Sequence, residues 1–237
     1  MLMNWLEEIG QEIPSDDFIE TLNVRNEEDD WKKERLGMVT GSQLGKLVKK
    51  DGTKGYKLST GKVATDLLYK IAWERFLKFD SNGLNRLSVS SKSMDHGNDY
   101  ELEAIKTYEE VAGNKVELGG YKFEKHNNFF GGTPDGKIDK DLIIEVKCPW
   151  NGGNHLKSLI EKVIYNDEHF YQIQGYLLIT GAKECDYVTY DPDLPEGINI
   201  SIIRIQRDEN VIEAIKSIID ECAKIINELI EQVKQKL

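Results

Sequence analysis

The sequence has few cysteines, few prolines and no long apolar run. Its three cysteines, Cys148, Cys185 and Cys222, are odd in number and far apart. This spacing argues against a disulfide framework and against a four-cysteine zinc or iron–sulfur site, and it favours a reducing compartment. No apolar stretch approaches the roughly 20 residues that cross a membrane, so we expect no membrane association. The first ten residues carry Glu7 and Glu8 and no basic group, so we expect no signal peptide.

The charge of the chain is unevenly distributed. The 237 residues carry a net charge of −11, with 39% hydrophobic and 31% charged residues, which is typical of a globular protein with a full core. Residues 1–34 hold eleven acidic and three basic side chains, whereas residues 32–78 hold twelve Lys or Arg and four acidic residues. A basic strip of this kind is compatible with a phosphate-binding surface and equally with solvated helix faces.

Apolar periodicity predicts an α/β fold. We divide the chain into an acidic N-terminal extension, residues 1–30, and one domain, residues 31–237. Helical spacing occurs in residues 31–50, 62–79, 97–112, 155–181 and 208–236, and strand spacing in 116–125, 137–139, 142–147, 187–190 and 198–206. Residues 51–60 are expected to form a basic loop. This order predicts a central mixed sheet flanked by helices.

The same patterns predict which helix faces are buried. Val63 and Phe76 are expected on the core side of the helix at 62–79, and Leu102 on that of the helix at 97–112. The last helix should bury seven residues at helical spacing, namely Ile212, Ile215, Ile219, Cys222, Ile226, Leu229 and Val233. We expect it to pack on the protein's own sheet, with a subunit interface as the alternative.

One cluster of charged residues stands out near the middle of the chain. Glu145 and Lys147 are two apart on a predicted strand, so they point to the same face of the sheet. Asp135 follows a Gly-Gly-Thr-Pro turn and can approach the same place. Two carboxylates suit Mg²⁺ or Mn²⁺, and an ammonium can offset the charge of a reacting phosphate. From spacing alone, a strand with surface charges beside a turn is the commoner explanation.

The order of several sequence blocks resembles a known family. Pro134-Asp135 and Glu145-Val146-Lys147 resemble the PD-(D/E)xK nuclease motif, and more narrowly the phage lambda exonuclease family, the YqaJ-like viral recombinase nucleases. The resemblance runs from about Asp29 to the C-terminal helix. Further blocks appear in the order of the family, at residues 31–42, 97–104, 132–136, 145–149, 170–176 and 190–192. The resemblance implies a restriction-endonuclease-like fold.

The resemblance also implies roles for individual residues. Asp135, Glu145 and the backbone carbonyl of Val146 would hold metal ions, Glu101 would be an additional carboxylate, and Lys147 would be the catalytic lysine. Gln174 resembles a residue that helps to place the attacking water. Gln172 is its neighbour, and the sequence leaves open which of the two faces the site.

The same resemblance implies a pocket for a terminal 5′-phosphate. Arg35, Ser42 and Thr133 would form it, and Thr133 stands where the family more commonly has Ser. A guanidinium and hydroxyl groups are suitable donors to phosphate oxygens. Gly41 stands where Ala is more usual in the family, a change expected to matter little.

The function implied by the resemblance is a Mg²⁺-dependent 5′→3′ exonuclease acting on the ends of double-stranded DNA. It would use two ions, with Mn²⁺ as a substitute, release mononucleotides and leave a 3′ single-stranded overhang for recombination. The family implies a ring-shaped homotrimer, a single-strand annealing protein as partner, and the cytoplasm of a bacterial or phage-infected cell. The alternatives are a sequence- or structure-specific endonuclease of the same fold and a non-catalytic DNA-binding module.

Overall fold

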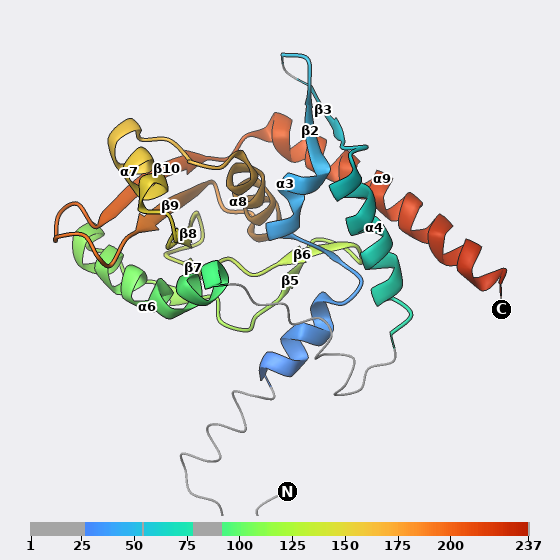
Figure 1. The fold of residues 1–237 in the computed structure, drawn as a ribbon, viewed down its shortest axis with the longest axis horizontal. Coiled ribbons are helices and arrows are strands. Elements are labelled where there is room, and N and C mark those ends of the chain that lie inside the picture. The colour runs from blue at the N-terminus through green and yellow to red at the C-terminus, as the bar shows by residue number, and fades with distance from the viewer. Residues whose placement is uncertain (1–26, 54, 78–91, 237) are drawn as a thin grey trace, which may run out of the picture.

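The centre of the molecule is a five-stranded mixed sheet with the order β10-β9-β8-β7-β4. The computed structural model describes residues 27–53, 55–77 and 92–236 (Figure 1). β8 runs parallel to β9, whereas the other neighbours in this sheet are antiparallel. The strands are β4 (Glu117–Leu118), β7 (Gly136–Lys137), β8 (Leu142–Lys147), β9 (Glu184–Tyr190) and β10 (Ile200–Gln206). The predicted hairpin that ends on the charged cluster is therefore confirmed as β7 and β8.

Helices cover both faces of this sheet, as the sequence predicts. α6 (Lys92–Ala112) packs on one face, where it contacts Ile144 and Val146 of β8. α8 (Asp167–Thr180) packs on the other face against Ile143. α7 (Gly152–Glu161) lies on that second face too, since His155 Nδ1 is 3.0 Å from Thr189 Oγ1 of β9. Alternation along β8 thus assigns Glu145 and Lys147 to the face covered by α8.

A second group of elements packs beside this sandwich around its own apolar cluster. A helix at residues 27–35 precedes it. The group contains a small sheet with the order β1-β6-β5, a hairpin, a short 3-10 helix and three α-helices. Its elements are β1 (Val39–Thr40), η1 (Gly41–Gln43), α3 (Leu44–Leu47), β2 (Val48–Asp51), β3 (Gly55–Leu58), α4 (Lys62–Glu74), β5 (Glu124–Lys125), β6 (Phe130–Gly132) and α9 (Glu209–Lys234).

The prediction of a loop at residues 51–60 is wrong, because most of this segment belongs to the β2–β3 hairpin. Val48 pairs with Leu58, and both side chains are buried in the apolar cluster that α4 and α9 share. Gly52 adopts a positive φ of 68° in the turn, which favours glycine. Lys49, Lys50 and Lys57 between these anchors are exposed, and Figure 1 shows the hairpin standing away from the body.

Some predicted core positions are exposed. Val63, Phe76 and Leu102 have exposed fractions of 62%, 40% and 64%. α4 ends at Glu74, so Phe76 lies beyond the helix, and the predicted end at 78–79 falls outside the described residues. α6 is longer than predicted, because it begins at Lys92. Helical spacing identifies an amphipathic helix better than it fixes the margins of its buried face.

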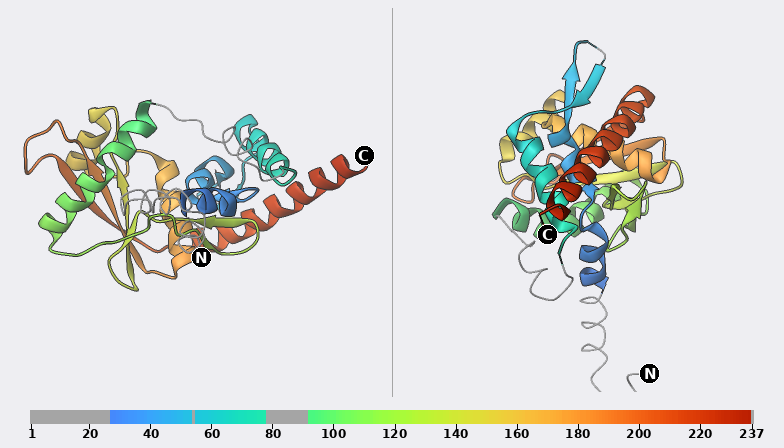
Figure 2. Two further views of the ribbon diagram at one scale, coloured as in Figure 1. Left: turned by 90° about the horizontal axis from the view of Figure 1, so that it is seen from below. Right: turned by 90° about the vertical axis from the view of Figure 1, so that its right-hand side faces the viewer.

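α9 confirms most of its predicted buried face, but it packs on different elements. The five predicted residues from Ile212 to Ile226 are buried, whereas Val233 is 46% exposed. The main contacts of the helix are with α4, α8 and β3. Figure 2 shows its C-terminal end extending beyond the rest of the protein. In the part of the chain that the structure describes, no helix is long and apolar enough to span a membrane.

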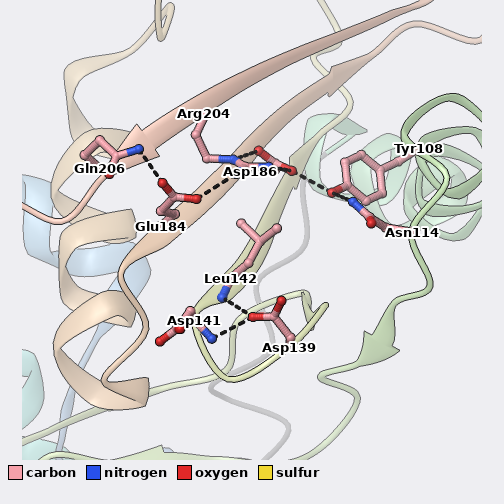
Figure 3. Close-up of polar contacts among 9 residues, drawn as sticks. All are labelled: Tyr108, Asn114, Asp139, Asp141, Leu142, Glu184, Asp186, Arg204 and Gln206. Atoms are coloured by element: carbon pink, nitrogen blue, oxygen red, sulfur yellow. Dashed lines mark hydrogen bonds and ion pairs between the residues drawn. The ribbon is translucent and has the colours of Figure 1, made fainter.

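A polar network ties α6 to the sheet on the face opposite α8 (Figure 3). Asp186 of β9 is buried, and its two carboxylate oxygens accept from Arg204 Nε at 2.5 Å and Nη2 at 3.0 Å. The Tyr108 hydroxyl of α6 donates to the same carboxylate at 2.6 Å. Both oxygens of this buried carboxylate accept hydrogen bonds, so the network has a structural role. Neither oxygen is left without a donor to bind a ligand.

Candidate active site

A cleft of about 380 Å³ opens at the C-terminal end of β8. It lies where α6, α8 and the η1–α3 segment converge on the strand end. Most of the polar residues proposed from the sequence line it. The lining includes Ser42, Lys46, Glu101, Asp135, Lys147 and Gln172.

Glu145 is the most constrained carboxylate of this site. Its side chain is fully buried, and its Oε1 accepts from Lys147 Nζ at 2.5 Å and from Gln172 Nε2 at 2.6 Å. Its other oxygen, Oε2, is buried without a hydrogen-bond partner among the residues that the structure describes. A buried carboxylate oxygen left without a donor is costly to the fold, so it marks a position where a bound group would be stabilised.

Asp135 reaches the same strand end from the turn between β6 and β7. Its Oδ2 accepts from the backbone N–H of Val146 at 2.7 Å, which fixes the carboxylate against β8. The antiparallel pairing of β7 with β8 sets Gly136 opposite Ile144 and so determines this approach. Asp135, Glu145 and Lys147, which the sequence proposed as a group, are therefore brought together.

The electrostatics of the cleft reflect an excess of negative charge. Burial and the neighbouring Asp135 raise the pKa of Glu145 to about 8, and Lys147 opposes both effects. Burial and Asp135 likewise raise the pKa of Glu101 to about 7, and burial raises the pKa of Asp135. Burial alone would lower the pKa of Lys147, but Glu145 and Asp135 outweigh it and raise that pKa. Three carboxylates, those of Glu101, Asp135 and Glu145, are coupled to the Lys147 ammonium, so an added cation would be favoured beside them.

The donor set fits a hard divalent cation. Mg²⁺ prefers oxygen ligands and is usually held by one or two carboxylates together with waters and substrate oxygens. Glu145 Oε2 and the carboxylate of Asp135 supply such ligands, and the backbone carbonyl of Val146 is on the same strand. Within the described ranges, no three His, Cys, Asp or Glu side chains form a ready cage for a metal.

The two glutamines of α8 have different surroundings. Gln172 faces the cleft, where its Nε2 contacts Glu145 and also lies 3.2 Å from the Tyr176 hydroxyl. Gln174 faces away: its Nε2 donates to the Gln206 carbonyl at 2.8 Å, and its Oε1 accepts from the Asp208 N–H at 2.9 Å. Residues two apart on a helix differ by about 200° in direction, so both cannot serve one site. The placement of Gln174 beside the attacking water is corrected accordingly.

Of the three residues predicted to bind a 5′-phosphate, Ser42 lines the cleft, whereas Arg35 and Thr133 are not among its described lining residues. The Arg35 guanidinium lies over the Trp31 ring at 3.9 Å. Trp31 Nε1 donates to Thr133 Oγ1 at 2.9 Å, and that hydroxyl donates to the Lys122 carbonyl at 2.9 Å. Arg35 and Thr133 are thus joined to each other through Trp31.

Lys46 and His169 are among the cleft residues that the sequence analysis did not single out. Lys46 lies four residues after Ser42, and His169 lies three before Gln172 on α8. Both follow the spacing that puts helical residues on one surface, so this signal could have found them. Burial and the charge of Lys147 lower the pKa of His169 to about 3, so its ring is neutral at pH 7, with Nδ1 2.8 Å from the Tyr187 hydroxyl.

Gly41 matters more than the sequence suggested. A Cβ placed at Gly41 would lie 2.2 Å from the Tyr176 ring, and one at Gly132 would lie 2.5 Å from it. The same edge of the ring therefore packs against both glycines, and the Tyr176 hydroxyl lies 3.2 Å from Gln172 Nε2. The expectation that alanine at this position would change little is wrong for this packing.

A comparison with protein-family models matches most of the chain to one family. The family model for the YqaJ-like viral recombinase domain matches residues 30–183. An uncharacterized protein of Acanthamoeba polyphaga mimivirus is 27% identical over 113 residues, which cover 42% of this chain and 20% of that protein. The chain thus spans a fifth of the length of that curated relative.

Solved structures share the fold. An alkaline exonuclease from Laribacter hongkongensis is similar with a TM-score of 0.72 and 25% identity, covering 87% of this chain and 96% of that chain. Its complex with dAMP gives a TM-score of 0.73 at the same identity and coverage. A phage-related exonuclease from Haemophilus somnus gives 0.64 at 19% identity, covering 83% of this chain and 96% of that chain, which shows the fold alone. The predicted restriction-endonuclease-like fold is confirmed.

Proposed function

Because the chain belongs to the YqaJ-like viral recombinase family, we propose that it is a deoxyribonuclease that hydrolyses phosphodiester bonds with bound Mg²⁺. Its similarity to alkaline exonucleases supports a nuclease, and more finely we propose 5′→3′ digestion from duplex ends that leaves a 3′ overhang. The observation that carries the proposal is the buried Glu145 Oε2, which lacks a donor beside Asp135 and Lys147 among the described residues.

The residues that would hold the ions are those at the strand end. Asp135, Glu145 and the carbonyl of Val146 would bind the first Mg²⁺, and Glu101 would bind the second. Mn²⁺, which takes similar oxygen ligands, should substitute. Bound Mg²⁺ would polarise the scissile phosphate and make a bound water easier to deprotonate.

Side chains of the protein would stabilise charge on the phosphate and orient the metal ligands. Lys147 Nζ, held 2.5 Å from Glu145 Oε1, would offset negative charge that develops on the phosphate. Gln172 would keep the Glu145 carboxylate oriented, since it donates to the same oxygen. The Glu101 carboxylate would be the additional carboxylate near the second ion or the attacking water, and a bound cation would offset the burial and the Asp135 charge that raise its pKa.

Positioning of the substrate would come from the other side of the cleft. In this proposal, the Ser42 hydroxyl and the exposed Lys46 ammonium would donate hydrogen bonds to phosphate oxygens. Arg35 and Thr133 remain predicted contacts for a terminal 5′-phosphate, and Arg35 would have to leave the Trp31 ring to reach it. Fixing an end phosphate would set which bond lies over the ions. A homotrimeric ring and a single-strand annealing partner belong to the same proposal.

The test compares a 5′-phosphorylated linear duplex with a supercoiled circle of the same sequence. Wild type, Lys147→Ala and Lys140→Ala would each be assayed with Mg²⁺ and with EDTA. Lys140 is an exposed lysine between β7 and β8, so it controls for loss of a surface charge. We expect Mg²⁺-dependent loss of the linear DNA alone, abolished by Lys147→Ala and retained by Lys140→Ala.

The other outcomes separate the alternatives. Nicking or linearising of the circle would replace the end-dependent exonuclease with an endonuclease of the same fold. Binding of DNA without cleavage of either substrate would favour a non-catalytic binding module. End labels would decide the direction, because 5′→3′ digestion releases a 5′-terminal label at once as a mononucleotide and keeps a 3′-terminal label on the shortening strand.

A further inference from the structure

Three aromatic rings form a group beside the cleft. The His96 and Trp150 rings meet edge to face, with centroids 5.4 Å apart, and the His96 and Tyr100 rings have centroids 4.8 Å apart. His96 and Tyr100 lie one turn apart on α6, whereas Trp150 follows β8. Trp150 is 64% exposed, so most of its indole faces solvent. We call this group, Trp150 with His96 and Tyr100, the aromatic platform.

The aromatic platform is continuous with the cleft on both of its elements. Cys148 and Pro149, which directly precede Trp150, line the cleft. Gly97 and Glu101, which directly follow His96 and Tyr100 on α6, line it as well. Trp150 is three residues beyond Lys147, which is at most roughly 10 Å of extended chain. A strand whose phosphate lies at Lys147 therefore passes within reach of the indole.

Packing alone does not account for an indole in this position. Cys148 is 7% exposed and Pro149 is buried, so the chain after β8 is already anchored before it reaches Trp150. Trp150 has its edge-to-face contact with His96, yet nearly two thirds of its surface stays in water. A large exposed aromatic ring at the rim of a polar cleft is typical of a surface that binds a flat ligand.

We propose that Trp150, supported by His96, stacks on an unpaired base of the DNA strand whose phosphates enter the cleft. The inference rests on the proposed function, because that function brings a DNA strand to Lys147. Every base offers an aromatic face, so stacking holds a strand without reading its sequence. The cleft would supply polar and charged contacts to phosphates. The aromatic platform would replace the stacking contact that an unpaired base no longer makes with neighbouring bases.

The experiment measures binding in EDTA, so it needs no cleavage. Two fluorescent single strands of equal length, one of deoxythymidines and one abasic, would be titrated with wild type, Trp150→Ala, Trp150→Phe and Ile160→Ala. The two strands carry the same phosphates and differ only in their bases. Ile160, on α7, is 75% exposed and controls for loss of an exposed apolar side chain.

Wild type should prefer the strand with bases by about 5- to 150-fold, since stacking on one aromatic ring is worth about 1–3 kcal/mol. Trp150→Ala should lose most of this preference while its affinity for the abasic strand stays close to that of wild type. Trp150→Phe should keep most of the preference, and Ile160→Ala should keep all of it.

Other results would overturn the inference. An equal loss of affinity for both strands in Trp150→Ala would assign Trp150 a structural role, and an unchanged preference would place the base elsewhere. Failure of wild type to prefer bases, or to bind either strand, would also reject stacking. A protein that prefers bases through Trp150 but does not cleave DNA with Mg²⁺ would keep this inference and reject the proposed function.

Discussion

Replacing Glu145 with glutamine should stabilise the metal-free protein and remove its response to Mg²⁺. Glu145 is fully buried, has one oxygen without a donor in the described structure, and shares the cleft with Asp135 and Glu101. Neutralising it removes repulsion between carboxylates, and Lys147 keeps Asp135 as a neighbouring opposite charge. The same change removes a ligand from the predicted metal site.

The magnitude follows from the buried charge. Burial and Asp135 raise the pKa of Glu145 to about 8, and each pKa unit corresponds to about 1.4 kcal/mol between its charged and neutral forms. Because glutamine weakens the contact with Lys147, we expect a net gain of only about 1–2 kcal/mol in the free energy of unfolding. In wild type, Mg²⁺ at ten times its Kd should add about 1.4 kcal/mol.

The assay is urea unfolding at pH 8 with EDTA and with a series of Mg²⁺ concentrations. Asp186→Asn is the matched control, because Asp186 is a buried carboxylate on the neighbouring strand whose oxygens accept from Arg204 and Tyr108 (Figure 3). Removing its charge should destabilise the protein by about 1–3 kcal/mol, since it leaves donors without their acceptor. This variant should retain the response to Mg²⁺.

The decisive result is that the free energy of unfolding in EDTA rises in Glu145→Gln and falls in Asp186→Asn. If Glu145→Gln loses stability in EDTA by as much as Asp186→Asn, the carboxylate is structural and its unbonded oxygen has no functional meaning. If Glu145→Gln gains as much stability from Mg²⁺ as wild type does, the ion binds elsewhere. Either result would refute the reasoning that leads from Glu145 Oε2 to a metal site.

The remaining predictions concern the surroundings of the cleft. Gln172→Leu should weaken Mg²⁺ binding about 10–100-fold by calorimetry, because it frees Glu145, whereas Gln174→Leu should leave Mg²⁺ affinity unchanged and lower stability by about 1–3 kcal/mol. Burial holds the pKa of His169 near 3, below its unfolded value of about 6.5, so its stabilisation is present above pH 6.5 and lost as the pH falls. Between pH 7 and 5.5 in EDTA, His169→Gln should therefore lose about 1.2 kcal/mol less than wild type in urea melts. Gly41→Ala should lower stability by about 1–3 kcal/mol in the same assay, because its Cβ meets the Tyr176 ring.

Each of these has a contrary outcome. Equal Mg²⁺ affinities in the two glutamine variants would remove the distinction between Gln172 and Gln174. Parallel pH profiles for wild type and His169→Gln would mean that the ring is not kept neutral by the fold. Unchanged stability in Gly41→Ala would show that the Tyr176 ring has room to move.

The central sheet was predictable because its signals are local and periodic. β8 alternates between the faces covered by α6 and α8, so the positions of Glu145 and Lys147 follow from their spacing alone. The β2–β3 hairpin was not predicted, because its composition of Gly, Lys and Ser is that of a loop. Its stability comes from Val48 and Leu58, which are buried against helices distant in sequence. Tertiary contacts of that kind leave no local pattern.

The candidate site divides in the same way. The strand positions Glu145 and Lys147 followed from a period of two, and Asp135 from the turn that joins the hairpin. The choice between Gln172 and Gln174 required the rotation of α8 about its axis, which is set by packing on Ile143 and on β10 rather than by the sequence near the glutamines. Residues from separate elements converge only once those elements are packed.

Net charge is a poor guide to the partner of this protein. Fields from exposed charges decay within about 10 Å at moderate salt, so the charge near the cleft matters more than the total of −11. Lys46 lines the cleft, and Lys50 Nζ at the hairpin lies 3.8 Å from Asp167 at the start of α8, which ties the basic hairpin to the cleft side. Residues 1–34 carry eleven acidic and three basic side chains, whereas residues 32–78 carry twelve basic and four acidic side chains. In the proposed function, Lys46 and Lys147 would contact substrate phosphates, and a divalent ion would neutralise the carboxylates that share the cleft with them.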